Sequence, residues 1–286
     1  MASSPDRVVV VTGASSGIGK ACAEAFARMG WHVIGTGRDP ARCDAAEAEL
    51  RAIPGARVDF LRGNFAEMAE VRRVAAEIAA LTDRVHVLVN NAGGIRDGHY
   101  VSSEGLEETF AANHLASFLL TRELMPLLER AAQDSPPGTV RVIAVSSLAH
   151  EQCAAMRWDD LMMDGDFATG PAYCQAKLAN LLFTRELDRR VSGKGITAQA
   201  MHPGKVGSNF WSHGEATLQA YGKGQDLIAP EAPARTIVWL ATAPEAGTEG
   251  GRYFHDLQEI PAAPQARDDT AAARLWQESE RILEAL

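Results

Sequence analysis

A tyrosine and a lysine stand four residues apart, at Tyr173 and Lys177. If this segment is helical, positions i and i+4 share one face, so the phenol and the ammonium point at the same place. A tyrosine ordinarily titrates at about 10, and a neighbouring cation lowers its pKa toward working pH. The pair therefore indicates a phenol that exchanges a proton with a substrate oxygen.

A glycine-rich turn, TGASSGIG, occupies residues 12–19 directly after an apolar run. Glycine allows a tight turn and lets the backbone approach a pyrophosphate at the N-terminus of a helix. The spacing is GxxxGxG instead of GxGxxG, and such a turn can also be purely structural. Because it follows a predicted strand and opens a predicted helix, we interpret it as a dinucleotide site. The expected contact residues are Gly13, Ser15, Ser16, Gly17, Ile18 and Gly19.

The end of the second predicted strand bears on the choice between the two nicotinamide dinucleotides. A carboxylate at this place hydrogen-bonds the adenosine ribose and repels a 2′-phosphate. The chain instead has Gly37, which has no side chain to clash, and Arg38, whose guanidinium suits a phosphate. Asp39 comes one residue too late and is better used as the N-cap of a helix that starts at Pro40. We therefore expect NADP(H) to be preferred, with NAD(H) possible, and a solvated surface arginine is the alternative.

Small polar residues follow the fourth predicted strand. Ligands of open α/β sheets bind at the carboxyl ends of the strands, so these residues are well placed to contact the cofactor. As a bare tetrapeptide the segment could equally be a turn. The residues are Asn90, Asn91, Ala92 and Gly93.

Apolar runs alternate with helical patterns along the whole chain, and these elements must position the residues named above. Strands are expected at 7–12, 31–36, 58–62, 85–90, 140–145, 197–201 and 252–254. Helices are expected at 18–29, 40–52, 67–81, 106–130, 171–191, 231–241 and 270–286. This alternation predicts an α/β fold with a mainly parallel, doubly wound sheet and helices on both faces. No repeat or linker divides the chain, so we predict one domain over residues 1–286.

Composition excludes several classes of function. The 286 residues carry a formal net charge of -9, which argues against a nucleic-acid partner. Four cysteines without a CxxC pair and eight histidines without ligand spacing argue against a metal site or a disulfide framework. Residues 1–7 lack an apolar signal segment, and no stretch approaches the length of a membrane span. We therefore expect a reduced, cytoplasmic protein.

Together these motifs resemble the short-chain dehydrogenase/reductase family, in its order and spacing and nearly from end to end. The segments that carry the resemblance are TGASSGIG (12–19), NNAG (90–93), Asn113 in NHL, the Ser146-Ser147 pair and YxxxK (173–177). Within the family the chain is most similar to the retinol-dehydrogenase-like branch. The segments that indicate this branch are NHLASFLLT (113–121), VSSLAH (145–150), WDDLM (158–162), YCQAKLAN (173–180) and MHPGKVGSN (201–209).

The resemblance implies the roles of four catalytic residues. Tyr173 would donate or accept the proton, and Lys177 would bind the nicotinamide ribose and lower the pKa of the tyrosine. Ser147 would hydrogen-bond the substrate oxygen, and Asn113 would hold a water for proton relay. Ser146 is the weaker serine candidate, because successive strand residues face opposite sides and the family uses the second of the pair.

The resemblance also implies further cofactor contacts, which Tyr173 and Lys177 share. Asn64 and Phe65 match the adenine position, although many members have aspartate where this chain has Asn64. Near the nicotinamide amide the family has a PGxVxT stretch, here with serine in place of threonine. The matching residues are Pro203, Gly204, Val206 and Ser208.

For the fold, the resemblance implies a single Rossmann-type domain with about seven strands in the order 3-2-1-4-5-6-7. A cofactor half would cover residues 1–145, and a catalytic and substrate half residues 146–286. Residues 205–229 contain aromatic side chains between glycines, which suits a mobile lid over an apolar ligand. An ordinary surface loop with aromatics packed beneath it is the alternative. The aromatic residues are Phe210, Trp211 and Tyr221.

The sequence thus predicts an NADP(H)-dependent oxidoreductase that transfers a hydride between nicotinamide and a small carbonyl or alcohol substrate of apolar character. A dinucleotide-binding sensor that has lost the chemistry is the main alternative, and the complete Tyr, Lys and Ser set counts against it. An enoyl reductase would space its Tyr and Lys more widely, and a nucleotide-sugar epimerase would have another glycine spacing. The sequence leaves open the substrate, the direction of reaction and the oligomeric state, and it is compatible with a homo-oligomer.

Overall fold

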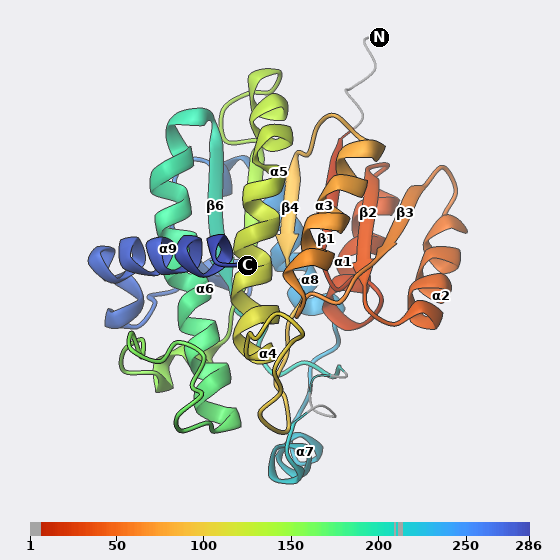
Figure 1. Cartoon of the computed structure of the whole chain (residues 1–286). Helices are drawn as coiled ribbons and strands as arrows, with labels where there is room; N and C mark the ends of the chain where they lie inside the picture. Colours follow the sequence, from red (N-terminus) through yellow and green to blue (C-terminus); the bar gives the residue numbers. More distant parts are fainter. Residues whose placement is uncertain (1–6, 209, 211–213) are drawn as a thin grey trace.

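Eight strands form one sheet in the computed structural model, which describes residues 7–208, 210 and 214–286 (Figure 1). The strands are β1 (Val8–Val11), β2 (His32–Gly37), β3 (Arg57–Arg62), β4 (Val87–Asn90), β5 (Val140–Val145), β6 (Ile196–Met201), β7 (Arg252–His255) and β8 (Gln258–Glu259). Their order is β3-β2-β1-β4-β5-β6-β7-β8, and all neighbours are parallel except β7 and β8. The predicted doubly wound sheet and the order of its first seven strands are confirmed.

The eighth strand was not predicted from the sequence. It pairs antiparallel with β7 through a turn at Asp256 and Leu257, whose φ angles are 44° and 65°. Two consecutive positive φ angles define a tight hairpin turn that usually contains glycine or asparagine. Because Asp-Leu lacks this signal and β8 has two residues, the sequence pattern does not reveal the hairpin.

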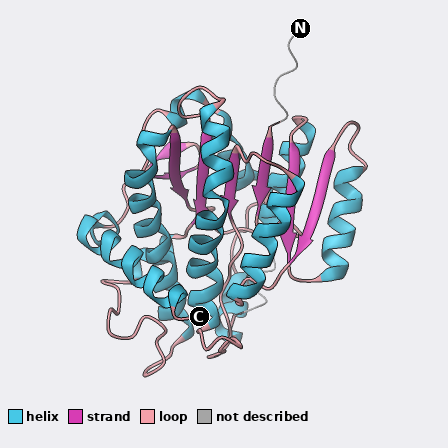
Figure 2. Cartoon of the chain, turned by 45° about the horizontal axis from the view of Figure 1, so that its top comes forward, coloured by secondary structure: helices cyan, strands magenta, loops and turns pink. Residues whose placement is uncertain are grey.

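Helices cover both faces of the sheet (Figure 2). They are α1 (Gly17–Arg28), α2 (Pro40–Arg51), α3 (Met68–Leu81), α4 (Glu108–Phe110), α5 (Ala116–Gln133), α6 (Thr169–Val191), α7 (Ala216–Lys223), α8 (Glu231–Thr242) and α9 (Asp269–Glu284). One layer contains α1 packed against α8, and the other contains α3 packed against α5 and α6 packed against α9. The carboxyl ends of the parallel strands stay open between these layers.

The sheet is held by apolar side chains on both faces, and β1 illustrates why. Its four consecutive valines are buried: Val8 and Val10 face the core formed with α3, α5 and α6. Val9 and Val11 face the opposite core, formed with α1 and α8. A continuous apolar run is typical of a parallel strand buried on both faces. This pattern agrees with the position of β1 between β2 and β4, and the glycine turn follows at the carboxyl end of the strand.

The single long helix expected at 106–130 is interrupted. The structure has α4, then a π-helical turn over Ala111–Leu115, then α5. Inside this turn, Asn113 Nδ2 donates to Thr109 O at 2.8 Å. Wide π-helical turns occur often at functional sites, because they redirect side chains and free backbone groups. Hydrophobic periodicity alone does not show such an interruption.

Candidate active site

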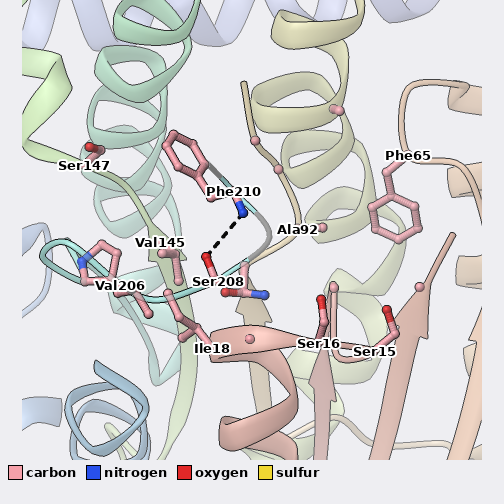
Figure 3. Close-up of a pocket in the computed structure, with 18 of the residues that line it drawn as sticks. Ser15, Ser16, Ile18, Phe65, Ala92, Val145, Ser147, Val206, Ser208 and Phe210 are labelled. Atoms are coloured by element: carbon pink, nitrogen blue, oxygen red, sulfur yellow. Dashed lines mark hydrogen bonds between the residues drawn. The ribbon is translucent and has the colours of Figure 1, made fainter. Parts of the chain in front are cut away.

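A cavity of about 440 Å³ lies at the carboxyl ends of the strands, where open α/β sheets bind ligands (Figure 3). Ser15 and Ser16 lie toward one end and Ser147 toward the other. Among the described residues, five basic side chains and no carboxylate line the cavity. In a chain of net charge -9 this asymmetry favours an anionic ligand. The basic residues are Arg38, Arg42, Arg96, Lys177 and Lys205.

The glycine-rich turn joins β1 to α1 along one wall of the cavity. Gly13 and Gly17 have φ angles of 67° and 53°, which glycine adopts most readily. A side chain at Gly13 would meet Asn91 Nδ2 at 3.0 Å and Ala92 Cα at 3.1 Å. Glycine at this position therefore lets the turn pack closely against the loop after β4, while the turn itself lines the cavity.

The N-terminus of α1 completes this cradle. Within the described chain, the N-cap residue Ser16 makes no side-chain hydrogen bond to the first helical turn, which leaves N–H groups for a ligand. Ser15 and Ile18, both predicted to contact the cofactor, line the cavity, whereas Gly19 does not. A Cβ at Gly19 would lie 2.3 Å from Gly13 O, so its contribution is the close packing of α1 against the turn.

The end of β2 has the features expected for a phosphate at the adenosine side. A Cβ at Gly37 would meet Cys43 Sγ at 2.6 Å, so a carboxylate side chain does not fit there. Arg38 lines the cavity, and Asp39 caps α2 by accepting from Arg42 N at 2.8 Å, which confirms the predicted cap. Arg42 also lines the cavity, and sequence reasoning missed it. A second basic residue in the first turn of α2 is the signal that could have revealed it.

The predicted adenine contacts follow β3. Asn64 and Phe65 both line the cavity, and Figure 3 shows Phe65 on the side of Ser15 and Ser16. Asn64 Oδ1 accepts from Ala66 N at 3.3 Å, which fixes the asparagine within its own loop.

The NNAG segment after β4 divides its residues between two tasks. Asn90 points into the core, where its Nδ2 donates to Thr121 Oγ1 at 3.0 Å, and it does not line the cavity. Asn91 Nδ2 donates to Thr12 O at 2.8 Å, which ties this loop to β1. Asn91, Ala92 and Gly93 line the cavity. The alternation of a strand separates the two asparagines, since neighbouring side chains face opposite ways.

Asn113 is fully buried behind this loop and does not line the cavity. Its Nδ2 donates to Gly94 O and Thr109 O at 2.8 Å each, and its Oδ1 accepts from Gly94 N at 3.0 Å. A Cβ at Gly93 would lie 2.4 Å from Asn113 Oδ1, which explains the glycine there. The asparagine thus shapes the loop after β4. Both of its amide hydrogens are already donated, and its predicted role in holding a relay water stays a prediction.

The two serines after β5 are used differently. Ser146 Oγ donates to Lys177 O at 2.8 Å and is buried against α6. Ser147 lies in the cavity wall (Figure 3). Its Oγ accepts from Ala149 N at 3.2 Å. The Ser147 hydroxyl also hydrogen-bonds with Tyr173, so the two side chains lie together in the cavity.

Tyr173 and Lys177 lie on one face of α6 and both line the cavity. Lys177 Nζ is 5.4 Å from the centre of the Tyr173 ring and donates to Val145 O at 3.1 Å. Burial lowers the pKa of Lys177 to about 8. Burial also raises the pKa of Tyr173, and its hydrogen bond with Ser147 opposes this. The spacing of Tyr173 and Lys177 predicts a lowered tyrosine pKa. The pKa is raised instead, because loss of solvation outweighs the effect of the nearby groups.

The residues after β6 form the opposite wall. Pro203, Gly204, Val206 and Ser208 all line the cavity, and their contacts with the cofactor stay predictions. Ser208 Oγ accepts from Phe210 N at 3.4 Å (Figure 3). The Phe210 ring lies 5.3 Å from the Tyr173 ring, which brings the start of the predicted lid over the tyrosine.

The rest of the predicted lid includes a helix that the sequence analysis did not propose. Helix α7 lies within residues 205–229, and Tyr221 is part of it. Trp211 lies outside the described residues, as do residues 1–6 of the expected polar N-terminus.

His202 also lines the cavity and was missed. Its ring stacks on His255 with centroids 3.9 Å apart, and Gly204 N donates to its Nδ1 at 3.2 Å. Burial lowers its pKa to about 4, so the ring is neutral at physiological pH. A single histidine before Pro-Gly carries no ligand spacing, and only the fold brings it beside the site.

The described residues contain no group of three or more His, Cys, Asp and Glu side chains arranged to hold a metal ion. In the same part of the chain, no helix is both long and apolar enough to cross a membrane.

Comparison with known proteins defines the class of this protein. The short chain dehydrogenase family matches residues 7–218, and the chain belongs to this family. It is an oxidoreductase that uses a dinucleotide and acts on CH–OH and C=O groups.

The similarity extends over nearly the whole chain. Human retinol dehydrogenase 13 is 37% identical over 289 residues, which cover 98% of this chain and 85% of that protein. An uncharacterized protein from Mycobacterium paratuberculosis has a crystal structure with a TM-score of 0.74 at 31% identity, covering 97% of this chain and 93% of that one. Another similar structure is described as an NAD(P)-dependent gluconate 5-dehydrogenase from Beutenbergia cavernae with bound NADP at low occupancy. Its TM-score is 0.67 at 26% identity, and the match covers 87% of this chain and 94% of that one.

Proposed function

We propose that this chain is an NADP(H)-dependent oxidoreductase that interconverts a carbonyl and an alcohol on an apolar small molecule. The observation that carries the proposal is that Ser147, Tyr173 and Lys177 reach the same cavity as the glycine cradle. One ligand can therefore extend from the cradle to the tyrosine. A substrate oxygen beside the tyrosine then lies next to the reacting end of the cofactor.

Each catalytic side chain has a distinct task in this proposal. The bound cofactor supplies or accepts the hydride. Tyr173 exchanges a proton with the substrate oxygen, and its raised pKa makes the neutral phenol, which can donate, the resting form. Ser147 hydrogen-bonds with Tyr173 and, once substrate is bound, donates to the same substrate oxygen. Lys177 binds the ribose and stabilises charge near the phenol. Donors aimed where negative charge develops lower the barrier more than they tighten ground-state binding.

The preference for NADP(H) is supported by the charge at the end of β2. Arg38 and Arg42 line this part of the cavity, where there is no room for a carboxylate at Gly37. Among the described residues, Arg38 has no hydrogen-bond or ion-pair partner, so its guanidinium is available to a 2′-phosphate. The structure from Beutenbergia cavernae, described as NAD(P)-dependent and holding NADP at low occupancy, is compatible with the same choice.

An apolar substrate is supported by the side chains around Tyr173. Phe210 packs near the phenol, Val206 lines the same region, and Leu148 lines the cavity while remaining 47% exposed. Exposed apolar side chains at a cavity mouth favour an apolar ligand. The similarity to retinol dehydrogenase 13 points the same way. In this proposal the segment 205–229 acts as the lid over such a substrate.

The test compares Tyr173→Phe with a matched control, Tyr100→Phe. Tyr100 lies outside the cavity, where its hydroxyl donates to Asp97 Oδ1 at 2.9 Å. Wild type and both variants are assayed for NADP(H) binding and for turnover of aldehydes, ketones, steroids and retinoids. Tyr173→Phe should keep cofactor affinity and lose turnover by about a hundredfold or more, since it lacks the acid–base group. Tyr100→Phe should behave like wild type.

Two outcomes would contradict the proposal. Folded Tyr173→Phe protein that turns over at nearly the wild-type rate excludes the phenol as the acid–base group. Wild-type protein that binds NADP(H) tightly and reduces or oxidises nothing in a broad panel favours the sensor alternative.

A further inference from the structure

His150 lies three residues after Ser147 and is fully buried. Its ring packs edge-on against Tyr253, with centroids 5.3 Å apart and an interplanar angle of 85°. It belongs to the short 3-10 helix Leu148–Gln152, for which Ser147 is the N-cap. A buried polar ring in this position must satisfy both of its nitrogens within the protein.

Both ring nitrogens have backbone partners, and these partners determine the tautomer. Nδ1 lies 2.7 Å from Ser147 O, a carbonyl that can only accept, so Nδ1 carries the hydrogen. Nε2 lies 3.2 Å from Ala263 N, an amide that donates, so Nε2 is the unprotonated nitrogen. His150 therefore joins Ser147 to a segment more than a hundred residues away in the chain.

That segment, Ala263–Gln265, holds the same short helix at a second point. Gln265 Nε2 donates to Cys153 O at 2.8 Å and to His150 O at 3.4 Å. The His150 ring thus connects the start of the short helix to Ala263, and Gln265 binds the carbonyl groups at the end of the same helix. Ser147 Oγ in turn accepts from Ala149 N in this helix, so the position of the hydroxyl depends on the helix that His150 anchors.

We propose that His150 is a positioning residue: its Nδ1–H holds the Ser147 backbone so that the serine hydroxyl points at the substrate oxygen. The inference rests on the proposed function for its catalytic consequence. The ring links Ser147, which follows β5, to the segment Ala263–Gln265, and it does not line the cavity. A displacement of the serine by a fraction of an ångström reduces the rate, because transition-state stabilisation depends on alignment.

Two substitutions of His150 separate its hydrogen bond to Ser147 O from its hydrogen bond with Ala263 N. Asparagine has an amide nitrogen near the position of Nδ1, so His150→Asn keeps a donor for Ser147 O and loses the contact to Ala263. Glutamine reaches the position of Nε2, so His150→Gln keeps an acceptor for Ala263 N and loses the donor to the serine. Ala263→Pro gives a third comparison, since it removes the amide hydrogen at a residue whose φ of -56° suits proline.

We expect the variants to differ in whether they lose mainly kcat or mainly thermal stability. His150→Gln should lower kcat by about tenfold to a hundredfold with unchanged NADP(H) affinity. His150→Asn and Ala263→Pro should keep much more of kcat and lose mainly thermal stability. If His150→Asn and His150→Gln lose kcat equally and in proportion to stability, or if His150→Gln retains wild-type kcat, the positioning role is overturned.

A second readout does not require turnover. The Ala149 amide donates to Ser147 Oγ, so its hydrogen exchange reports on the serine directly. Exchange should be slow in wild type and in His150→Asn, and faster in His150→Gln. Equal protection in all three proteins overturns the inference even if no substrate is found, whereas an inactive wild type with the expected exchange pattern counts against the proposed function alone.

Discussion

Replacing Lys177 by methionine should make the protein more stable and less active. The lysine is 5% exposed, and burial lowers its pKa from 10.5 to about 8. This difference corresponds to about 3 kcal/mol of unfavourable free energy for the charged form. Methionine removes that cost but leaves Val145 O without its donor, which costs about 1–2 kcal/mol. We expect a net gain in the free energy of unfolding of about 1–2 kcal/mol at neutral pH.

The pH dependence of this gain follows from the direction of the pKa shift. Below about pH 8 the ammonium is charged in both the folded and the unfolded states, so the cost of burying it is fully present. Between about 8 and 10.5 the folded protein loses the proton first, and this contribution to wild-type stability rises with pH. The difference between Lys177→Met and wild type should therefore shrink over this interval.

Urea unfolding of both proteins across this pH range measures the effect. Lys194→Met is a matched control, because Lys194 is exposed and pairs with Glu129 at 2.6 Å. It should change stability by less than about 1 kcal/mol, as exposed ion pairs do. A Lys177→Met protein that is less stable than wild type at every pH would refute the reasoning. Unchanged turnover would refute the role of the ammonium at the site.

The remaining predictions concern the phosphate contact and a buried arginine. Arg38→Ala and Arg42→Ala should each weaken NADP(H) binding by about tenfold to a hundredfold and leave NAD(H) binding almost unchanged, as titration with each dinucleotide would measure. Equal losses for both dinucleotides would contradict the assignment. Arg141→Met should lower the free energy of unfolding by about 3 kcal/mol or more in urea denaturation, because the buried guanidinium donates to three backbone carbonyls. Its cofactor affinity should not change, and a loss below about 1 kcal/mol would show that the carbonyls find other partners.

Local patterns in the sequence determined the architecture and the main chemical residues. The four valines of β1 indicate a strand buried on both faces, and the glycines after it indicate a turn that admits a pyrophosphate. Asp39 before Pro40 marks the start of α2, and the spacing of Tyr173 and Lys177 puts them on one face of α6. Each of these inferences depends on neighbours within about one or two helical turns, so the printed chain contains the information needed.

Only the tertiary structure decided which of the adjacent polar residues face the cavity. Asn90 and Asn91 are neighbours in the chain, and contacts with distant Thr121 and Thr12 give them different environments. In the same way, no pattern within the segment around His150 indicates that its imidazole bonds to a residue 113 positions later.

The direction of the Tyr173 pKa shift and the hairpin of β7 and β8 could not be predicted from the sequence either. The sequence shows the charged residue near Tyr173 but not how far the phenol is removed from solvent, and this burial reverses the direction of the pKa shift. The hairpin of β7 and β8 forms at Asp256-Leu257 without a turn signal, and Leu257 N donates to Thr236 Oγ1 of α8 at 3.3 Å. These properties depend on the packing of segments far apart in the chain, because burial and long-range hydrogen bonds exist only after folding.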